Sequence, residues 1–402
     1  MKYTIDSPIP PLRKDLSIYK SNSNFYTIID DNDYSNIEIN FNEKYIEYLQ
    51  MLDGRLTIID ILLSLDDNQK IFDKVYFLNL INKLEKSLYL FSLNFLDYKY
   101  KIDKDYENSD LREMRFAGVS YNADPVELKQ QLDGYLGNNL YNSNQKPIGV
   151  IAPHIDFRVG GDSYGAVYNA IKLSDAETFI ILGTAHKMSY DKFMFCKKDF
   201  ETPLGIVKTD KEFINQFKNN LSFSITENEL SHKTEHSIEF EVVMLKHIFQ
   251  DREIKIVPIL AGSFYEYVES GNKDINLDSE LNELYFTLTK TALQLKRKVC
   301  YIASSDLSHF GLRFGDLDTA NSFLQNVEKN DSCVLSIIEK CDANSFIEFM
   351  INCKNKYRVC GIAPIYAMLK SLNPQKANVL SYNYWDDYEH GSGVTFAGIV
   401  FY

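Results

Sequence analysis

Histidine is scarce in this chain of 402 residues, and three of its seven histidines occur in one kind of place. His154 follows the apolar run "IGVIAP", His186 follows "FIILGTA", and His309 lies in "SSDLSHFG" after "KVCYIA". Each run has the length and apolar content of a buried strand. In open α/β sheets, ligands bind beyond the carboxyl ends of the strands, and imidazole is a good ligand for Fe, Zn, Cu and Ni. This placement predicts a metal or catalytic site at one sheet edge.

A fourth histidine and several carboxylates are candidates for the same site. His236, in "HKTEHSIEFE", opens a predicted helix over 236–249 that is apolar on two faces and therefore buried. Two histidines and one carboxylate would leave coordination positions open, as oxygen-using non-haem iron requires. The carboxylate is Asp306, with Asp156 or Glu235 as alternatives.

Each of these residues also has a purely structural interpretation. His236 alone is about as well explained as a core histidine that hydrogen-bonds a backbone carbonyl. His154 and His186 could bond loops at strand ends, and Asp156 with Arg158 could form an exposed ion pair of little energetic consequence. The metal-site hypothesis depends on the histidines as a set.

From about residue 116 onward, short apolar runs alternate with helical patterns. The predicted strands are 148–152, 178–183, 254–260 and 298–304, with a last one in the terminal "GVTFAGIVFY". The predicted helices are 162–173, 211–219, 236–249, 279–296 and 317–328. Nearly all-apolar strands separated by helices indicate an α/β fold, with a parallel or mixed sheet covered by helices on both faces.

The first hundred residues contain no histidine and no cysteine, and differ in pattern. Within "YLQMLDGRLTIIDILLSL" (48–65), Asp53-Gly54 marks a turn, and Thr57 can cap a helix with apolar positions up to Leu65. A second helical pattern covers 71–90, and "LYLFSLNF" (88–95) is a strand or a helix end. We predict a small helical, winged-helix-like module over 1–100, with a helical packing domain as the alternative.

Residues 101–115, "KIDKDYENSDLREMR", are dense in charge and are predicted to be a linker. The α/β domain then covers 116–402.

Composition narrows the class of protein. The chain is 45% hydrophobic and 25% charged, which is typical of globular proteins. No apolar run approaches the ~18 residues that cross a membrane, and no secretory signal is recognisable. The net charge of −13 argues against sequence-independent binding of nucleic acid. None of the six cysteines forms a C-x-x-C pair, so we expect a reduced, cytoplasmic protein without a disulfide framework.

Seven motifs occur in an order that resembles a known family. They are "APHIDFRVGGDSYGAVYNAI", "LGTAHK", "ETPLGIVKTD", "EHSIEFEVVMLKHIF", "VPILAG", "SSDLSHFG" and "CGIAPIYAML". The chain from about 116 to 402 resembles the Memo family, in particular the longer microbial form called AmmeMemoRadiSam system protein B. The resemblance implies a fold like that of the class III extradiol ring-cleaving dioxygenases, with a histidine-framed cleft that binds iron or copper.

The resemblance also implies roles for particular residues. By motif, His154 and His186 match the first two metal ligands. Position 308 matches the place where animal Memo proteins carry a cysteine ligand, and here it is Ser308, whose hydroxyl is hard to deprotonate. The third ligand would then shift to Asp306, to His309 or to water.

His236 matches a family histidine that lines the pocket and parallels the acid/base histidine of the dioxygenases, and its ordinary pKa suits proton transfer. His309 is the second candidate for catalysis. Fe(II) is the expected metal, with Cu or Zn as alternatives. The candidate pocket residues are Asp156, Arg158, Glu235, Thr202 and Cys360. Of these, Thr202 belongs to a Pro-Gly turn at the rim, and Cys360 is interpreted as a buried thiol packed against a glycine.

Three functions follow from these residues. The first is a metal-dependent, dioxygenase-like redox enzyme. The second is a non-catalytic adaptor that binds a peptide or small molecule in the same pocket. The third is a zinc metallopeptidase, because "HKTEH" (232–236) fits the motif H-x-x-E-H, with His232 as a ligand. The family name further implies a radical-SAM enzyme and an AMMECR-type protein as partners, to which the N-terminal module could dock.

Overall fold

The computed structural model describes residues 3–22, 24–64, 73–137, 141–187, 191–225 and 227–402. These residues form two compact units, Met1–Asn108 and Ser109–Tyr402. Leu65 and the first two residues of the helix predicted over 71–90 lie outside the described residues.

The second unit is built on a mixed sheet with strand order β12-β14-β5-β11-β6-β10-β7, in which β13 also pairs with β14 and β9 with β10. Its parallel centre consists of β5 (Gly149–Ala152), β11 (Val299–Ser304), β6 (Thr178–Thr184) and β10 (Lys255–Ala261). The short strand β9 (Lys208–Thr209) runs parallel to β10. Antiparallel strands flank this centre: β12 (Asp306–Gly311), β13 (Ala377–Asp387), β14 (Ser392–Phe401) and β7 (Phe193–Phe195).

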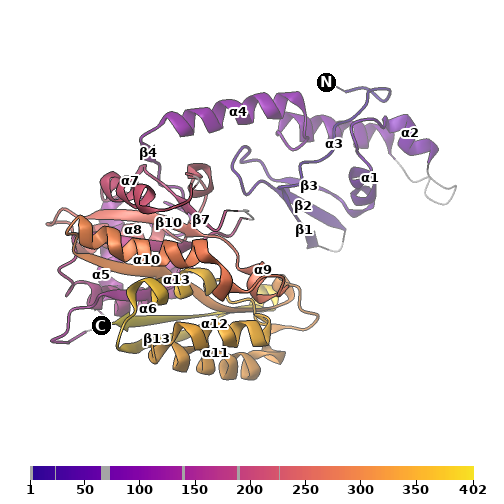
Figure 1. Cartoon of the computed structure of the whole chain (residues 1–402). Helices are drawn as coiled ribbons and strands as arrows, with labels where there is room; N and C mark the ends of the chain where they lie inside the picture. The colour runs from indigo at the N-terminus through magenta and orange to yellow at the C-terminus, as the bar shows by residue number, and fades with distance from the viewer. Residues whose placement is uncertain (1–2, 23, 65–72, 138–140, 188–190, 226) are drawn as a thin grey trace. The chain divides into compact units, whose positions relative to one another are not determined.

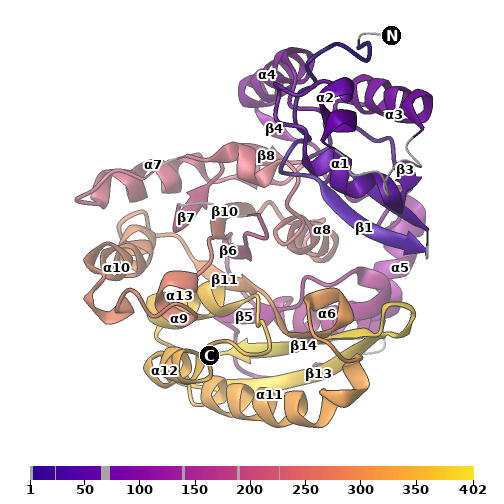
Figure 2. The ribbon, with the colours of Figure 1, turned by 90° about the vertical axis from the view of Figure 1, so that its right-hand side faces the viewer.

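Helices cover both faces of this sheet, as Figures 1 and 2 show. One face carries α5 (Pro125–Gly137), α6 (Phe157–Ile171) and α8 (Glu239–Ile248). The other carries α7 (Lys211–Asn220), α10 (Ser279–Gln294), α11 (Leu324–Glu339), α12 (Ala343–Cys353) and α13 (Ile362–Leu372). The predicted α/β class is confirmed.

The central strands are almost entirely apolar because both of their faces are buried. In β5, Val150 and Ala152 belong to the core beneath α6 and α8, whereas Ile151 between them belongs to the core beneath α13. Successive side chains of a strand point to opposite faces, so a strand between two helical layers needs apolar residues at every position.

The structure differs from the predicted elements in four places. The segment "DLSHFG", for which no strand is predicted, forms strand β12, and β13 is a long strand that the sequence does not indicate. Most residues of β13 are only partly buried, so its polar sequence lacks an apolar signal. Helix α8 begins at Glu239, so His236 precedes the helix instead of opening it, and α11 begins at Leu324.

The first unit combines a small sheet with helices. Strands β1 (Ser17–Asn22), β2 (Phe25–Ile29) and β3 (Ile39–Asn42) form an antiparallel sheet in that order. Helices α1 (Ile46–Gln50), α2 (Ile58–Leu63), α3 (Lys74–Lys86) and α4 (Leu93–Asn108) follow. Thr57 caps α2 in a capping box with Asp60. The sequence patterns do not predict the three-stranded sheet.

The charged stretch 101–115 contains the last turns of α4, up to Asn108, and the two-residue strand β4 (Leu111–Arg112). Strand β4 pairs with β8 (Asp199–Phe200) and already belongs to the second unit. None of the helices among the described residues has both the length and the apolar content for crossing a membrane.

Candidate metal centre

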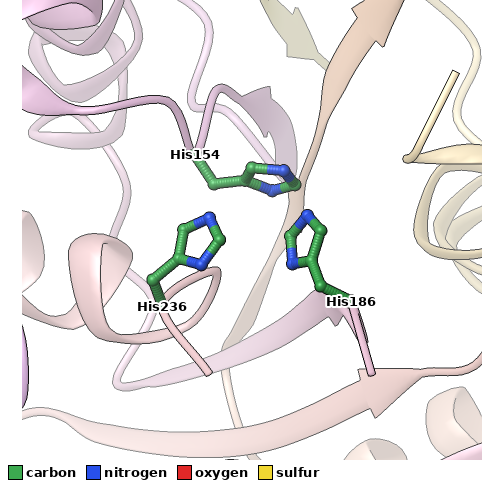
Figure 3. A group of neighbouring side chains, drawn as sticks. All are labelled: His154, His186 and His236. Carbon is green, nitrogen blue, oxygen red and sulfur yellow. The ribbon is translucent and has the colours of Figure 1, made fainter. Parts of the chain in front are cut away.

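Three histidines converge at the carboxyl edge of the parallel strands. His154, His186 and His236 each offer a ring nitrogen, and these nitrogens all lie within 4.8 Å of one another. The ring centroids are 4.9 Å apart for His154 and His186, 5.3 Å for His154 and His236, and 4.6 Å for His186 and His236 (Figure 3). Such a group of imidazoles can hold one cation.

The sheet positions two of these histidines directly. Strands β5 and β6 both pair with β11, run parallel and end two residues before His154 and His186 respectively. Because the carboxyl ends of parallel strands meet at one edge, both side chains reach the same place.

His236 lies in a turn that is hydrogen-bonded to the same sheet edge. The Ser237 hydroxyl donates to the Thr184 carbonyl at the end of β6 (2.8 Å), and the Ser304 hydroxyl at the end of β11 donates to the Ser237 carbonyl (2.5 Å). These bonds hold the turn before α8 against the sheet edge.

Glu235 connects two of the three histidines. Its Oε1 lies 3.0 Å from His186 Nδ1 and 3.2 Å from His236 Nδ1, and accepts hydrogen bonds from the backbone N–H groups of His236 (2.8 Å) and Ser237 (3.1 Å). Its Oε2 accepts from the His186 backbone N–H (2.9 Å). Glu235 therefore lies behind the imidazoles, as an outer carboxylate that supports them.

His154 is only 2% exposed and has different neighbours. Its backbone N–H donates to Asp306 Oδ1 (3.1 Å), and its Nδ1 lies 3.4 Å from the Ser304 hydroxyl. Its Nε2 lies 3.3 Å from Cys360 Sγ and 3.7 Å from Asp306 Oδ2.

Cys360 is brought to the cluster by a close backbone approach. A Cβ on the next residue, Gly361, would lie 1.4 Å from the Ser305 hydroxyl oxygen, so only glycine fits there. The glycine is closely packed as predicted, but against Ser305, and Cys360 is only partly buried. The sequence does not indicate, however, that the thiol faces the histidines. All six cysteines are free.

Burial and charge set the protonation of these groups. Burial and the neighbouring histidines lower the pKa of His154 well below its usual value, and burial lowers the pKa of His236 to about 4. Burial also opposes charge on His186, but Glu235 raises the pKa of His186 well above its usual value. Burial raises the pKa of Asp306 to about 7. Two of the three imidazoles are therefore neutral at pH 7, the form that binds metal.

Three predicted site residues lie on strand β12, and each contacts different groups. Asp306 lies beside His154. The Ser308 hydroxyl donates to Asp331 (2.6 Å), so Ser308 does not serve as a third ligand. His309 Nδ1 lies 3.1 Å from the carbonyl oxygens of Leu307 and Arg358, and burial lowers the pKa of His309 to about 4.

The remaining pocket candidates have structural roles. Asp156 caps α6 by accepting from the Arg158 backbone N–H (2.9 Å), and also accepts from the Arg158 guanidinium (2.6 Å for Nη2). The Thr202 hydroxyl closes its turn by donating to the Gly205 carbonyl (2.7 Å). No hydrogen bond or ion pair among the described residues joins these side chains to the histidines.

His232 lies outside the histidine cluster. It ends a short 3-10 helix, it is 1% exposed, and its Nε2 lies 3.0 Å from the Met194 carbonyl oxygen. The H-x-x-E-H motif needs both histidines on one helix, but α8 begins only after His236. The metallopeptidase interpretation is wrong for this geometry.

A cavity of about 280 Å³ opens beside the cluster. Its wall includes His186 and Cys360 together with Glu269, Asn355 and Arg358. The histidine cluster therefore borders a space with both acidic and basic side chains.

Comparison with known proteins agrees with this geometry. The family model described as "Memo-like protein" matches residues 112–400. The chain belongs to the Memo family. Its relatives include a MEMO1 family protein of Aquifex aeolicus, 27% identical over 80% of this chain and 81% of the relative. Another, from Methanocaldococcus jannaschii, is 28% identical over 66% of this chain and 89% of the relative. A third, from Archaeoglobus fulgidus, is 28% identical over 72% of this chain and 99% of the relative.

The Memo motifs supply the three histidines of this cluster and also contain Ser304 and Cys360, but the motifs do not indicate that these two side chains contact His154. Ser304 precedes the motif aspartate and looks like an ordinary strand residue. The thiol of Cys360 lies about two hundred positions from His154 in the sequence, and no local pattern connects them.

Proposed function

We propose that this Memo protein binds a single divalent cation through His154, His186 and His236 and uses it in dioxygenase-like redox chemistry. The observation that carries the proposal is the convergence of three imidazole nitrogens within 4.8 Å at the edge of a buried sheet. Fe(II) is the expected metal, with Cu or Zn as alternatives, because all of them accept imidazole ligands.

The donor set fits such a cation. Two of the imidazoles are held neutral by burial, which keeps the pKa of each low, and Glu235 supports the third. The thiol of Cys360 is a soft donor beside His154, which favours a transition metal over Mg²⁺ or Ca²⁺. When bound, a redox-active cation would supply one-electron and dioxygen chemistry.

The chain's own groups would bind and orient a substrate. The cavity beside His186 and Cys360 provides room for a small molecule or the end of a peptide. Asp306, with its pKa raised to about 7 by burial, can hold or release a proton at Oδ2 close to His154. These groups support an enzyme more than a passive adaptor, because an adaptor has no need for a buried proton carrier.

The test is metal analysis after anaerobic purification, with and without reductant. We expect one equivalent of metal per chain. His154→Ala should lose it, while His232→Ala, which removes a histidine of equal burial, should keep it. If the wild-type protein neither contains Fe, Cu or Zn nor takes up any when they are added, the adaptor function becomes the better explanation.

We also propose that the first unit docks a partner of the system, a radical-SAM enzyme or an AMMECR-type protein. The support is its three-stranded sheet, in which β3 pairs only with β2 among the described strands and so offers an edge for strand addition. Co-purification of the full chain with each of these proteins, compared with a chain that lacks residues 1–108, tests the proposal. Equal recovery with both chains would contradict it.

A further inference from the structure

The three histidines do not depend on the same supporting groups. Glu235 Oε1 lies within 3.2 Å of Nδ1 in both His186 and His236. His154 has instead a neutral hydroxyl, that of Ser304, at 3.4 Å from its Nδ1. The direction of each hydrogen bond determines which ring nitrogen carries the proton.

At His186 the direction is fixed by Glu235. Both oxygens of Glu235 already accept backbone N–H groups, Oε2 from His186 and Oε1 from His236 and Ser237, so this carboxylate serves as an acceptor toward the ring. Nδ1 of His186 must therefore carry a hydrogen. The other nitrogen, Nε2, is then the one that a cation can take.

At His154 the direction follows from a second bond of Ser304. The Ser304 hydroxyl lies 2.5 Å from the carbonyl oxygen of Ser237, which can only accept, so the single hydroxyl hydrogen points there. Toward His154 the hydroxyl oxygen can then only accept. Nδ1 of His154 must donate, and Nε2 is again the nitrogen left for a cation.

We propose that Glu235 and Ser304 are positioning residues that hold the hydrogen of His186 and His154 on Nδ1, so that each presents Nε2 to one cation. This inference rests on the proposed metal-binding function and explains how the metal-free protein orients its histidine rings before a cation binds. Ring orientation fixed in advance lowers the cost of binding, and outer partners of this kind change metal affinity by about 10-fold to 100-fold.

Ser304 has an additional effect because it bonds both sides of the cluster. Its hydroxyl joins the strand end beside His154 to the turn that carries His236. Without this hydroxyl, nothing would fix which nitrogen of His154 carries the hydrogen. The turn that carries His236 would also lose one of its hydrogen bonds to the sheet edge.

A competing arrangement exists for His154. Its Nε2 lies 3.7 Å from Asp306 Oδ2, and a proton on Nε2 would attract that carboxylate. This distance is too long for a hydrogen bond, whereas the distance to Ser304 Oγ is shorter. The two arrangements predict opposite tautomers, which makes them separable by experiment.

The experiment is nitrogen-15 NMR of the histidine side chains in the metal-free full chain, followed by titration with Zn²⁺ and, anaerobically, Fe²⁺. In the wild-type protein we expect a hydrogen on Nδ1 of both His154 and His186. Ser304→Ala should give His154 a mixture of tautomers and weaken metal binding about 10-fold. Glu235→Gln should weaken it about 10-fold to 100-fold.

Matched controls separate positioning from general damage to the core. Ser308→Ala removes a hydroxyl from an equally buried serine, and Asp331→Asn changes another buried carboxylate. Neither should alter the histidine tautomers or the metal affinity.

An Nδ1 without hydrogen on His154 or His186 in the wild-type protein would overturn the proposal without any variant. Unchanged tautomers and unchanged affinity in both Ser304→Ala and Glu235→Gln would also overturn it. The tautomers are read without metal, so a wild-type protein that binds no metal would end the proposed function and leave the tautomer assignment as a separate result.

Discussion

Two buried carboxylates in this protein, Glu235 and Asp331, are each surrounded by hydrogen-bond donors, yet the donors differ in kind. Glu235 accepts from an imidazole and from backbone N–H groups at the sheet edge. Asp331, on α11, accepts from the hydroxyls of Ser308 (2.6 Å), Thr395 (2.6 Å) and Tyr382 (3.0 Å).

The difference indicates what each cluster can do. Hydroxyl donors do not change charge near neutral pH and leave no ligand for a metal, so the Asp331 cluster can only join α11 to β12, β13 and β14. Imidazoles have a second nitrogen, so the Glu235 cluster can support a cation while holding the turn before α8. Burial of a carboxylate alone does not distinguish a functional site from a structural one.

The largest expected effect is the loss of metal affinity when His236, in the Glu235 cluster, is replaced. The sequence predicts an acid/base role for this residue, and the structure groups it with His154 and His186. His236→Ala should weaken metal binding by more than about 100-fold, beyond the range of outer-shell changes, with little loss of fold stability. Metal titration and thermal unfolding measure the two quantities. Retention of metal at wild-type affinity would return His236 to the acid/base role.

Much of this site can be predicted from the sequence, for a physical reason. His154 and His186 follow apolar runs, and parallel strands bring their carboxyl ends to one edge whatever their order in the sheet. The apolar runs alone therefore predict that these two side chains lie at the same edge of the sheet.

Other parts of the site cannot be predicted, because they depend on pairings between distant residues. The polar residues of "SSDLSHFG" suggest a turn, which would bring both Ser308 and His309 to the site. In strand β12 a register irregularity between Asp306 and His309 interrupts the regular alternation of side chains, so Asp306 lies beside His154 whereas Ser308 bonds Asp331. The approach of Cys360 depends on contact between Gly361 and Ser305, residues more than fifty positions apart.

The next effect is on stability, at the structural cluster. Asp331→Ala would leave the buried hydroxyls of Ser308 and Thr395 and the partly buried hydroxyl of Tyr382 without their acceptor, and an unsatisfied buried group costs about 1–3 kcal/mol. We expect the free energy of unfolding to fall by about 3 kcal/mol in urea titration, while the metal content stays at the wild-type level. Loss of metal in a folded Asp331→Ala protein would mean that the two clusters are coupled.

A third effect is on pH dependence, at Glu241 in α8. This residue is fully buried, Tyr168 hydrogen-bonds to it, and burial raises its pKa to about 8. Between its usual pKa and about 8 the unfolded chain has lost the proton that the folded chain keeps. Its contribution to stability is therefore complete at low pH and declines as pH rises toward 8, by at most ~1.4 kcal/mol per pH unit.

The measurement is the free energy of unfolding of wild-type protein and Glu241→Gln between about pH 5 and about pH 9, which spans the titration. A glutamine has no proton to lose, so the difference between the two proteins should change steadily with pH up to about 8 and then level off. A difference that is constant over the whole range would show that Glu241 is ionised in the fold.

The smallest expected effect is at Ser308, and it tests whether this side chain belongs to the Asp331 cluster or faces the metal. If this position faced the metal, Ser308→Cys would add a thiolate ligand and strengthen binding of Zn²⁺, because zinc prefers sulfur. The structure directs the side chain to Asp331 instead. We therefore expect unchanged metal affinity and a stability loss of about 1 kcal/mol, the net value of one hydrogen bond. Cobalt(II) substitution gives the decisive readout, because a new sulfur ligand would add a thiolate charge-transfer band that a cysteine facing Asp331 cannot produce.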